Sequence, residues 1–445
     1  GAIYGSGTGR SHADAWAGFS RIVWGPAGVK EGDVLYVCGT HRETLEVGTS
    51  GTEGGKITIR GSCPGDAGTI DAGYSRQNCL VLTGLSGVEI EDISMKQSAS
   101  HALVMQGTKD CKVSRCAFSR IGIQVGASYT IDGRYAEGAA ISGNILTGAE
   151  GAFPANGIIV NTGLPSPAAS IVEKNRIDGI GGDGITAGSS VLVSENTVSN
   201  LLNTLVHSDG IVVQGSYVSV ARNTVYDCTQ NIYVDAFDYG AGLSVCNNVE
   251  IWANLVYGTS AGAPVGVTGI AVDAETGGRA SIANLKIYNN TIADCVFNGI
   301  TVGDRSPEGG KLASLDIRNN VLINNGGYNR QFRFTGHPPR GLTLDYNLTL
   351  NTIYDGGSSL TYLWYGAHKD LAGMRALGYE VHGLSQIQPV LSGYTYLSRG
   401  NSFMLDPRSE ANGAGINLGQ AFATDHAGRK RPAEARWDPG CFESL

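Results

Sequence analysis

Two columns of acidic residues are the part of this sequence best suited to chemistry. Both are counted from Gly-Ile or Asn-Ile pairs that recur along the chain. Asp183 and Asp209 stand two residues before such an Ile, and Asp235 and Asp273 stand three residues after one. If successive pairs lie on neighbouring strands about 4.8 Å apart, each Asp stacks on its partner. Two carboxylates at that distance oppose each other's ionisation, which raises one pKa and suits acid–base catalysis.

Further polar residues surround these columns in the sequence. We predict that the catalytic residues are Asp235 and Asp273 as the leading pair, supported by Asp209, Asp183 and His207. The predicted substrate-binding residues are Tyr233, Asp238, Glu275, Arg279 and Arg305, and Asp304 lies in the same cluster. Strand residues alternate between faces, so Tyr233, next to Ile232, can project outward.

The two columns of Asp are compatible with three kinds of chemistry, and also with a purely structural role. A pair of carboxyls hydrolyses glycosides, one as acid and one as nucleophile or base. A lyase needs a base near an acidic sugar, for which His207, Tyr233, Arg279 and Arg305 are candidates. Oxygen ligands on successive strands also suit Ca²⁺, which would place a metal at Asp183 and Asp209; no cofactor is otherwise required. In a purely structural alternative, the Asp-Gly pairs at Asp183 and Asp209 only form turns.

A repeat in the sequence supplies the elements that would align these residues. An Asn recurs at gaps from 21 to 36 residues, each time after a β-branched run, at Asn144, Asn175, Asn196, Asn223, Asn254, Asn290, Asn320 and Asn347. Cys116 and Ile93 extend the column upstream. This spacing predicts an all-β fold, a parallel β-solenoid of about ten coils whose strands are three to five residues long. Stacked Asn side chains should form a ladder, with each Asn in the left-handed conformation of a turn.

Composition agrees with a solenoid and excludes other classes. Of 445 residues, 65 are Gly and 16% are charged, unlike a helical bundle. The net charge of -8 and the absence of a basic face argue against a nucleic-acid partner, and no stretch is apolar enough for a membrane span. The nine Cys lack zinc-binding spacing, and those in apolar runs, such as Cys38 and Cys79, are predicted to be buried thiols.

The ends of the chain do not repeat, and solenoids need caps. Residues 11–24 have helical spacing and predict an N-terminal cap helix, and 370–378 predict one further short helix. We expect a solenoid over residues 1–349 and a C-terminal cap region over 350–445 packed on it. Insertions are predicted to form one wall of a groove, at 127–138, 148–155, 162–169, 237–242, 259–267, 275–281 and 304–311.

The chain resembles the right-handed parallel β-helix superfamily, the pectate-lyase-like fold. The resemblance lies in GDVLYVCGTHRETLEV and GTIDAG near the start and in the tail from Asp425 to Glu443. GGDGI and HSDGI also match the positions at which polygalacturonase-like hydrolases and calcium-dependent pectate lyases carry acids. That match implies roles for Asp183 and Asp209, whereas Ser208 and Val212 stand where those enzymes have further acids.

These observations predict an enzyme that cleaves a polysaccharide in a groove along the solenoid, with hydrolysis ranked above lyase chemistry. The alternative is a non-catalytic glycan-binding protein or a phage tailspike, which would be a trimer. Either is expected to be secreted, on the cell surface or on a virion, although no signal peptide is present in the sequence.

Overall fold

The computed structural model describes the chain in segments that together cover most of the sequence: 7–122, 128–148, 155–162, 168–202, 208–238, 243–259, 267–275, 278–306, 309–326, 330–353, 358–388 and 390–444. The contacts between residues divide it into two compact units, residues 1–186 and 187–445. Both units contain parallel sheets of short strands stacked coil upon coil, as expected for a parallel β-helix.

The first unit contains strands of three sheets. The first sheet contains β1 (Val34–Tyr36), β4 (Ile57–Arg60), β7 (Val88–Glu91), β10 (Lys112–Ser114), β13 (Ala140–Ser142) and β16 (Ser170–Glu173). The second contains β2 (Thr40–His41), β5 (Thr69–Asp71), β8 (Ser94–Lys96), β11 (Ala117–Ser119), β14 (Ile145–Thr147) and β17 (Arg176–Asp178). The third contains β3 (Leu45–Glu46), β6 (Asn78–Val81), β9 (His101–Val104), β12 (Tyr129–Gly133) and β15 (Asn156–Val160), and β18 (Ile185–Ala187) spans the boundary between the units.

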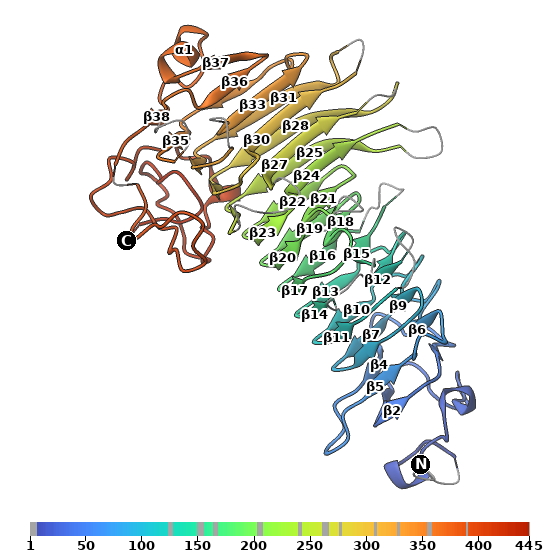
Figure 1. The fold of residues 1–445 in the computed structure, drawn as a ribbon. Helices are drawn as coiled ribbons and strands as arrows, with labels where there is room; N and C mark the ends of the chain where they lie inside the picture. The colour runs from blue at the N-terminus through green and yellow to red at the C-terminus, as the bar shows by residue number, and fades with distance from the viewer. Residues whose placement is uncertain are drawn as a thin grey trace. The chain divides into compact units, whose positions relative to one another are not determined.

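The second unit repeats this order with longer strands. Its first sheet contains β19 (Val191–Ser194), β22 (Val218–Ala221), β25 (Val245–Trp252), β28 (Ser281–Tyr288), β31 (Leu312–Arg318) and β34 (Thr343–Asp345). Its second contains β20 (Thr197–Leu201), β23 (Thr224–Cys228), β26 (Leu255–Tyr257), β29 (Thr291–Ala293), β32 (Val321–Ile323), β35 (Leu348–Leu350) and β38 (Leu384–Ser385). Its third contains β21 (Ile211–Val213), β24 (Gln230–Ala236), β27 (Thr268–Ala274), β30 (Asn298–Asp304), β33 (Phe332–Gly336), β36 (Tyr362–Trp364) and β37 (Ala367–Lys369). Figure 1 shows β22, β25, β28 and β31 lying side by side.

Strand length differs from the prediction of three to five residues. In the second unit β24, β27, β30 and β31 each have seven residues, and β25 and β28 have eight. These longer strands precede or follow the segments that the sequence identifies as insertions. The insertion predicted at 127–138 is wrong, because that segment forms strand β12 and the turn after it. The predicted insertions at 148–155, 162–169, 237–242 and 259–267 fall largely outside the described residues, so the predicted groove wall stays a prediction.

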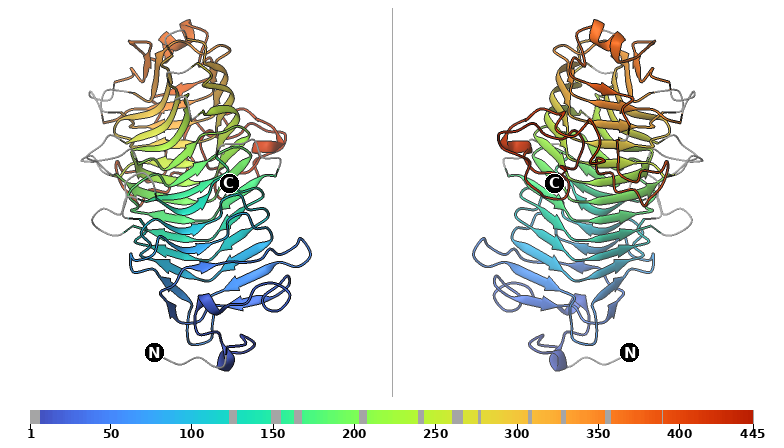
Figure 2. Two further views of the ribbon diagram at one scale, coloured as in Figure 1. Left: turned by 90° about the vertical axis from the view of Figure 1, so that its right-hand side faces the viewer. Right: turned by 90° about the vertical axis from the view of Figure 1, so that its left-hand side faces the viewer.

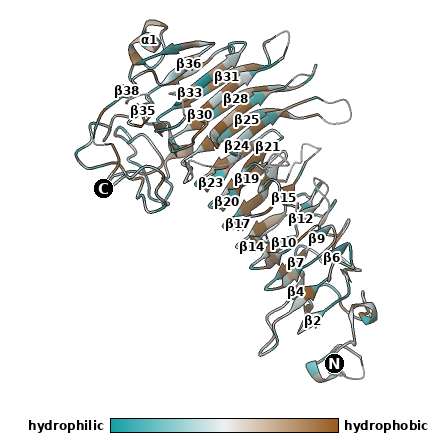
Figure 3. Cartoon of the chain, in the orientation of Figure 1, coloured by the Kyte–Doolittle hydropathy of each residue, from teal (hydrophilic) through white to brown (hydrophobic). Residues whose placement is uncertain are grey.

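Columns of aliphatic side chains form the core. Ile211 pairs in register with Ile232, then with Ile270, Ile300 and finally Phe332, and all five side chains are fully buried. Figure 3 shows apolar residues concentrated in the strands. Each such side chain contributes about 2–3 kcal/mol by its removal from water, so the stack accounts for the repeating Ile.

The predicted Asn ladder is confirmed. In the second unit the side-chain amide of Asn223 donates to Oδ1 of Asn254 at 3.0 Å, and Asn254 donates to Asn290 at the same distance. The ladder continues through Asn320 to Asn347, whose amide donates to the buried carboxylate of Glu380 at 2.9 Å. Every rung also receives a backbone N–H, so these buried amides are satisfied.

The predicted left-handed conformation of the ladder Asn is wrong. The positive φ falls on the residue before each Asn, including Arg222 (φ 55°), Ala253 (φ 53°) and Tyr346 (φ 59°). The Asn itself points into the turn, where its side chain must meet the next coil. The turn therefore needs the amide at one position and a left-handed backbone at the preceding position.

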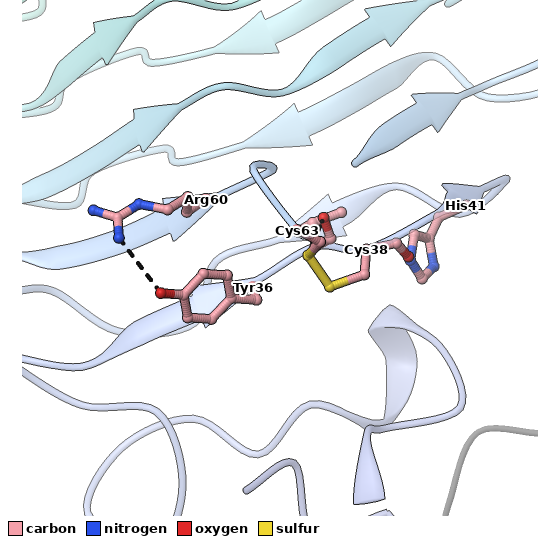
Figure 4. The surroundings of a disulfide bond; sticks show 6 residues. Tyr36, Cys38, His41, Arg60 and Cys63 are labelled. Atoms are coloured by element: carbon pink, nitrogen blue, oxygen red, sulfur yellow. Dashed lines mark hydrogen bonds between the residues drawn. A yellow bond between two sulfur atoms is a disulfide. The ribbon is translucent and has the colours of Figure 1, made fainter. Parts of the chain in front are cut away.

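The N-terminal cap helix predicted for residues 11–24 is also wrong. That segment forms two single turns of 3₁₀ helix, η1 (His12–Asp14) and η2 (Phe19–Arg21), because an extended Ala15 and a positive φ at Gly18 interrupt the helix. Nearby, Cys38 forms a disulfide with Cys63, which corrects the prediction that Cys38 is a free thiol (Figure 4). The other seven cysteines, including Cys79, are free and buried.

The C-terminal residues continue the coils and then pack against their side. The predicted short helix is confirmed as α1 (Leu371–Ala376), with the Asp370 side chain accepting from Gly373 N at 2.8 Å. From residue 390 the chain runs along the second sheet of its unit, where Leu391, Phe403 and Leu405 pack on Leu255 and Val321 (Figure 2). A further 3₁₀ turn, η4 (Gln420–Phe422), packs on Trp252. No helix in the described part of the chain is long and apolar enough to cross a membrane.

Candidate active site

Strands β24 and β27 bring the leading acid pair together. In β24 the side chains of Ile232 and Val234 enter the core, so alternation places Tyr233 and Asp235 on the opposite face. Asp235 pairs in register with Asp273 of β27. The predicted stacking of these two residues is therefore confirmed, while their catalytic role stays a prediction.

Asp235 has neutral hydrogen-bond donors and negative neighbours. Gln214 Nε2 donates to its Oδ2 at 3.1 Å, and the Tyr233 hydroxyl also hydrogen-bonds to it. Burial raises the pKa of Asp235 to about 6, and the charges of Glu275 and Asp209 act in the same direction. This environment favours a carboxyl that keeps its proton up to about pH 6, well above the usual range of an Asp.

Asp273 has a cationic partner. Nη2 of Arg305 lies 2.6 Å from its Oδ2, and the Arg305 side chain is 63% exposed while that of Asp273 is 9% exposed. Burial raises the pKa of Asp273 to about 6, with Asp235 adding to the shift and the charges of Arg305 and Arg333 opposing it. Of the two acids, Asp273 has the direct ion pair, which stabilises its ionised form.

Several buried polar atoms on the same sheet make no hydrogen bond within the described part of the chain. They lie on neighbouring strands in register and comprise Gln230 Oε1, Asp273 Oδ1, Asn298 Oδ1, Thr301 Oγ1 and Arg333 Nε. More than nine in ten buried polar groups in proteins have a partner, so such a concentration is unusual. It indicates a surface built for a ligand that supplies the missing hydroxyls and acceptors.

The remaining predicted site residues are distributed differently. Glu275 and Asp209 lie within electrostatic reach of Asp235. Asp209 also has a structural use, because its Oδ1 accepts from Gln230 N at 3.0 Å. Asp304 closes a turn, accepting from Ser306 N and Lys311 N.

Asp238 and Arg279 are engaged with each other. Nε of Arg279 lies 3.0 Å from Oδ2 of Asp238, and the backbone N of Arg279 donates to the same oxygen at 3.1 Å. This pair joins two loops beside the acid site, and its predicted contact with substrate stays a prediction.

Asp183 and His207 cannot be assigned to this site. Asp183 belongs to the first unit, where it acts electrostatically on Tyr129, so its predicted stacking on Asp209 stays a prediction. His207 lies outside the described residues.

Sequence reasoning missed Gln214 and Arg333. Gln214 stands in the Asp235 column but is neutral, so it does not stand out among acids. Arg333 follows Phe332, which continues the Ile column in register with Ile300. Because Gln331-Phe332 replaces Gly-Ile there, the repeat is not visible at that coil. Only the distance from the preceding coil could have indicated that Arg333 belongs to this column.

A metal site was predicted at Asp183 and Asp209. The two residues fall in different units, and no group of three or more His, Cys, Asp or Glu side chains in the described segments is arranged to hold a metal ion. Calcium at these residues stays a prediction.

Comparison with known proteins identifies the fold. Residues 156–354 match the family described as "Right handed beta helix region". Among solved structures, the chain is similar to XylC, solved in complex with xylose, with 9% identity, a TM-score of 0.56, and coverage of 98% of this chain and 96% of that one. No curated protein matches the sequence. The chain therefore has the right-handed parallel β-helix fold, as predicted.

Two other solved structures align more loosely. They are the PL6 family alginate lyase AlyGC, with 14% identity, a TM-score of 0.48 and coverage of 74% of this chain, and a tailspike protein of E. coli bacteriophage HK620 in complex with pentasaccharide, with 10% identity, a TM-score of 0.44 and coverage of 76% of this chain and 71% of that one. The chain spans about half the length of the alginate lyase. At these identities the likeness concerns the fold.

Proposed function

We propose that the chain is a polysaccharide-active enzyme that hydrolyses glycosidic bonds on the third sheet of its second unit. The carrying observation is a stacked carboxyl pair, Asp235 and Asp273, among buried polar atoms that have no partner within the described residues. XylC, which has the same fold, was solved with a sugar, and a sugar is the class of ligand that these atoms suit.

The two carboxyls have environments suited to different tasks. Asp235, held by Gln214 and Tyr233, is the group that donates a proton to the leaving oxygen. Asp273, paired with Arg305, is ionised and acts as nucleophile or as base toward water. Burial raises the pKa of both carboxyls to about 6, so the Arg305 ion pair is what distinguishes them, and a pair of carboxyls with different partners is typical of glycosidases.

The orphaned atoms support a hydroxylated substrate. Amide oxygens at Gln230 and Asn298 can accept from sugar hydroxyls, and the Thr301 hydroxyl can donate or accept. Leaving a buried polar atom unpaired costs about 1–3 kcal/mol, so a ligand that satisfies several of them gains affinity and specificity.

The test is a screen against plant, algal and bacterial polysaccharides, read by new reducing ends and by ultraviolet absorbance together. We expect wild type to release reducing ends without an absorbing product. Asp235→Asn and Asp273→Asn should each abolish turnover while the circular dichroism spectrum is retained. Asp178→Asn is the matched control, because it makes the same chemical change at a partly exposed Asp of the first unit, 3.8 Å from the exposed Arg176. Wild-type turnover in both site variants would refute the assignment.

A lyase is the second candidate, and one observation favours it. Arg305 and Arg333 lie close enough to Asp273 to act on its ionisation, and Arg330 acts on Arg333, so the site holds cations that could neutralise a uronate. β-Elimination gives an unsaturated product that absorbs in the ultraviolet. An absorbing product would therefore replace hydrolysis by elimination as the proposed reaction.

Calcium dependence is a separate proposal that the same screen can test. If Asp183 and Asp209 hold Ca²⁺ for an acidic substrate, a chelator should abolish turnover and added Ca²⁺ should restore it. Unchanged turnover in chelator would remove the metal from the proposal.

We further propose that the protein acts outside the cytoplasm, at a cell surface or in the medium. The Cys38–Cys63 disulfide supports this, because disulfides persist mainly in oxidising compartments. A glycan-binding protein without turnover is the remaining alternative. Such a protein would bind some of the polysaccharides in the screen and produce neither new reducing ends nor an absorbing product.

A further inference from the structure

A second polar cluster lies in the first unit, on strands β9 and β12. It consists of His101, Tyr129, Asp132 and Arg134, with Gln106 beside them. Asp132 pairs in register with Val104 on one side and Ile159 on the other, and both aliphatic residues are nearly buried. An isolated carboxylate within an aliphatic column requires an explanation, because an aliphatic residue there would be equally or more stable.

Asp132 is fully engaged. Nε and Nη2 of Arg134 donate to its two oxygens at 2.9 and 2.8 Å, and Gln106 Nε2 donates at 2.6 Å. Burial alone would raise the pKa of Asp132, but the hydrogen bonds from Arg134 and Gln106 outweigh it and lower the pKa. Asp132 is therefore an ionised anchor with no capacity left for a ligand.

His101 is fixed in one neutral form. Its Nδ1 accepts the backbone N–H of Tyr129 at 3.0 Å, so that nitrogen carries no proton. Burial lowers the pKa of His101, which also favours the neutral ring. The single ring proton is then on Nε2, 3.8 Å from Asp132 Oδ2. Neutral His101 is consequently a permanent donor rather than an acid.

The groups that Asp132 orients keep hydrogen-bonding capacity. Arg134 is held edge-on by Asp132, its guanidinium carbon lies 5.4 Å from the centre of the Tyr129 ring, and its side chain is 37% exposed. Within the described segments, neither Nη1 of Arg134 nor the Tyr129 hydroxyl makes a hydrogen bond. The buried ion pair thus holds an arginine in a fixed plane with its outer edge available.

We propose that Arg134, Tyr129 and His101 form a second saccharide-binding site, which holds a sugar unit without cleaving it. The outer edge of Arg134 binds two adjacent sugar oxygens, either a carboxylate or neighbouring hydroxyls, since a planar guanidinium donates in parallel. The Tyr129 hydroxyl binds a third oxygen. Asp183, which acts electrostatically on Tyr129, lies near this site. The site does not rest on the function proposed for Asp235 and Asp273.

Binding is tested on the full chain carrying Asp235→Asn, so that no probe is consumed. The probes are hexasaccharides of xylan, polygalacturonate and alginate, titrated by calorimetry and followed by ¹⁵N-histidine NMR. We expect at least one probe to shift the Nε2 resonance of His101, identified by its loss in His101→Gln. Arg134→Gln and Tyr129→Phe should each weaken the affinity that this resonance reports, Arg134→Gln by about tenfold.

The controls are Arg176→Gln and Tyr217→Phe, which make the same chemical changes at exposed positions, 61% and 65% exposed. Both should bind as the parent does. Binding of uronate probes alone identifies a carboxylate ligand, and binding of the xylan probe identifies hydroxyl recognition. The inference is overturned if no probe moves the His101 resonance at saturation, or if Arg134→Gln and Tyr129→Phe bind as tightly as the controls. Neither result affects the product assay that tests the function proposed for Asp235 and Asp273.

Discussion

Asp235 and Asp273 are chemically equal residues that their neighbours make different. Neutral donors hold Asp235, whereas Arg305 forms an ion pair with Asp273. The sequence predicted that the two carboxyls stack, because the distance from each Ile is the same. It named Arg305 as a site residue but could not predict its ion pair with Asp273, and it missed Arg333, which lies on a coil whose repeat is obscured by Phe332.

Arg305 should set the acid side of the pH–rate profile. If Asp273 must be ionised, activity rises as it loses its proton and falls as Asp235 loses its own, both near about 6. Arg305→Gln removes a charge that lowers the pKa of Asp273, so the acid limb should move to higher pH while the alkaline limb stays. The measurement is kcat/KM against pH, with Arg408→Gln as the control at an exposed ion pair. An unmoved acid limb would separate Arg305 from the chemistry.

Asp235 should also reduce stability at neutral pH. A carboxyl whose pKa is raised in the folded state favours folding most below its unfolded pKa of about 3.9, and this contribution is lost as pH rises through about 6. Asp235→Asn should therefore raise the free energy of unfolding by on the order of 1–2 kcal/mol at about pH 8, with no gain at about pH 4. Urea denaturation at both pH values measures this. An equal effect at both would attribute the change to packing.

At the scale of elements, the repeat was predictable and its exceptions were not. Equal spacing revealed the Ile columns and the Asn ladder, because every coil repeats the same contacts. The segment 11–24 has helical spacing of apolar residues, but an extended Ala15 and a positive φ at Gly18 break it into 3₁₀ turns. Of the apolar residues in that pattern Phe19 is buried, whereas Val23 is 46% exposed, so local periodicity predicted neither the backbone path nor the burial there.

The tail motif from Asp425 to Glu443 has a structural explanation. Arg431 is buried and donates to the backbone oxygens of Asp438 and Gly440 and to Glu443. His426 Nδ1 lies 3.0 Å from the oxygen of Ala253 in the turn after β25. The motif therefore fastens the C-terminal segment to the coils, and its charged residues need no catalytic role.

Asn254 should be one of the most sensitive positions in the ladder. Its side chain receives the N–H and the amide of Asn223 and donates to Val220 O and to Asn290. Asn254→Ala leaves several buried polar groups without a hydrogen-bond partner and should lower the free energy of unfolding by about 2–4 kcal/mol. Thermal or urea denaturation measures the loss. Asn284→Gly, at an exposed position of β28 with positive φ, should cost far less; equal losses would show that the ladder is not what stabilises the turn.

At the scale of the molecule, the cysteines are of two kinds, disulfide-bonded and buried as thiols. Cys38 and Cys63 form a disulfide near the N-terminus, and the other seven are buried thiols. The odd number was visible in the sequence, but which two pair depends on the fold, since their separation of 25 residues has no meaning until the coils are placed.

Thiol titration should reproduce this division. Protein denatured without reductant should react at seven thiols, and protein reduced first should react at nine. Reduction should also destabilise the N-terminal coils by about 2–4 kcal/mol, because it frees a loop that the bond closes. Nine reactive thiols before reduction would remove the disulfide and the support it gives to an extracellular location.

Glu380 lies at the C-terminal end of the Asn ladder in the second unit. Each Asn of the ladder both accepts from the preceding coil and donates to the next, and the last of them, Asn347, donates its backbone N–H and its amide to the carboxyl of Glu380. A duplicated coil inserted anywhere before Asn347 would find a donor below and an acceptor above, and would extend the stack without new chemistry. Duplicating a coil before Asn347 would therefore lengthen the solenoid and leave Glu380 as its last rung.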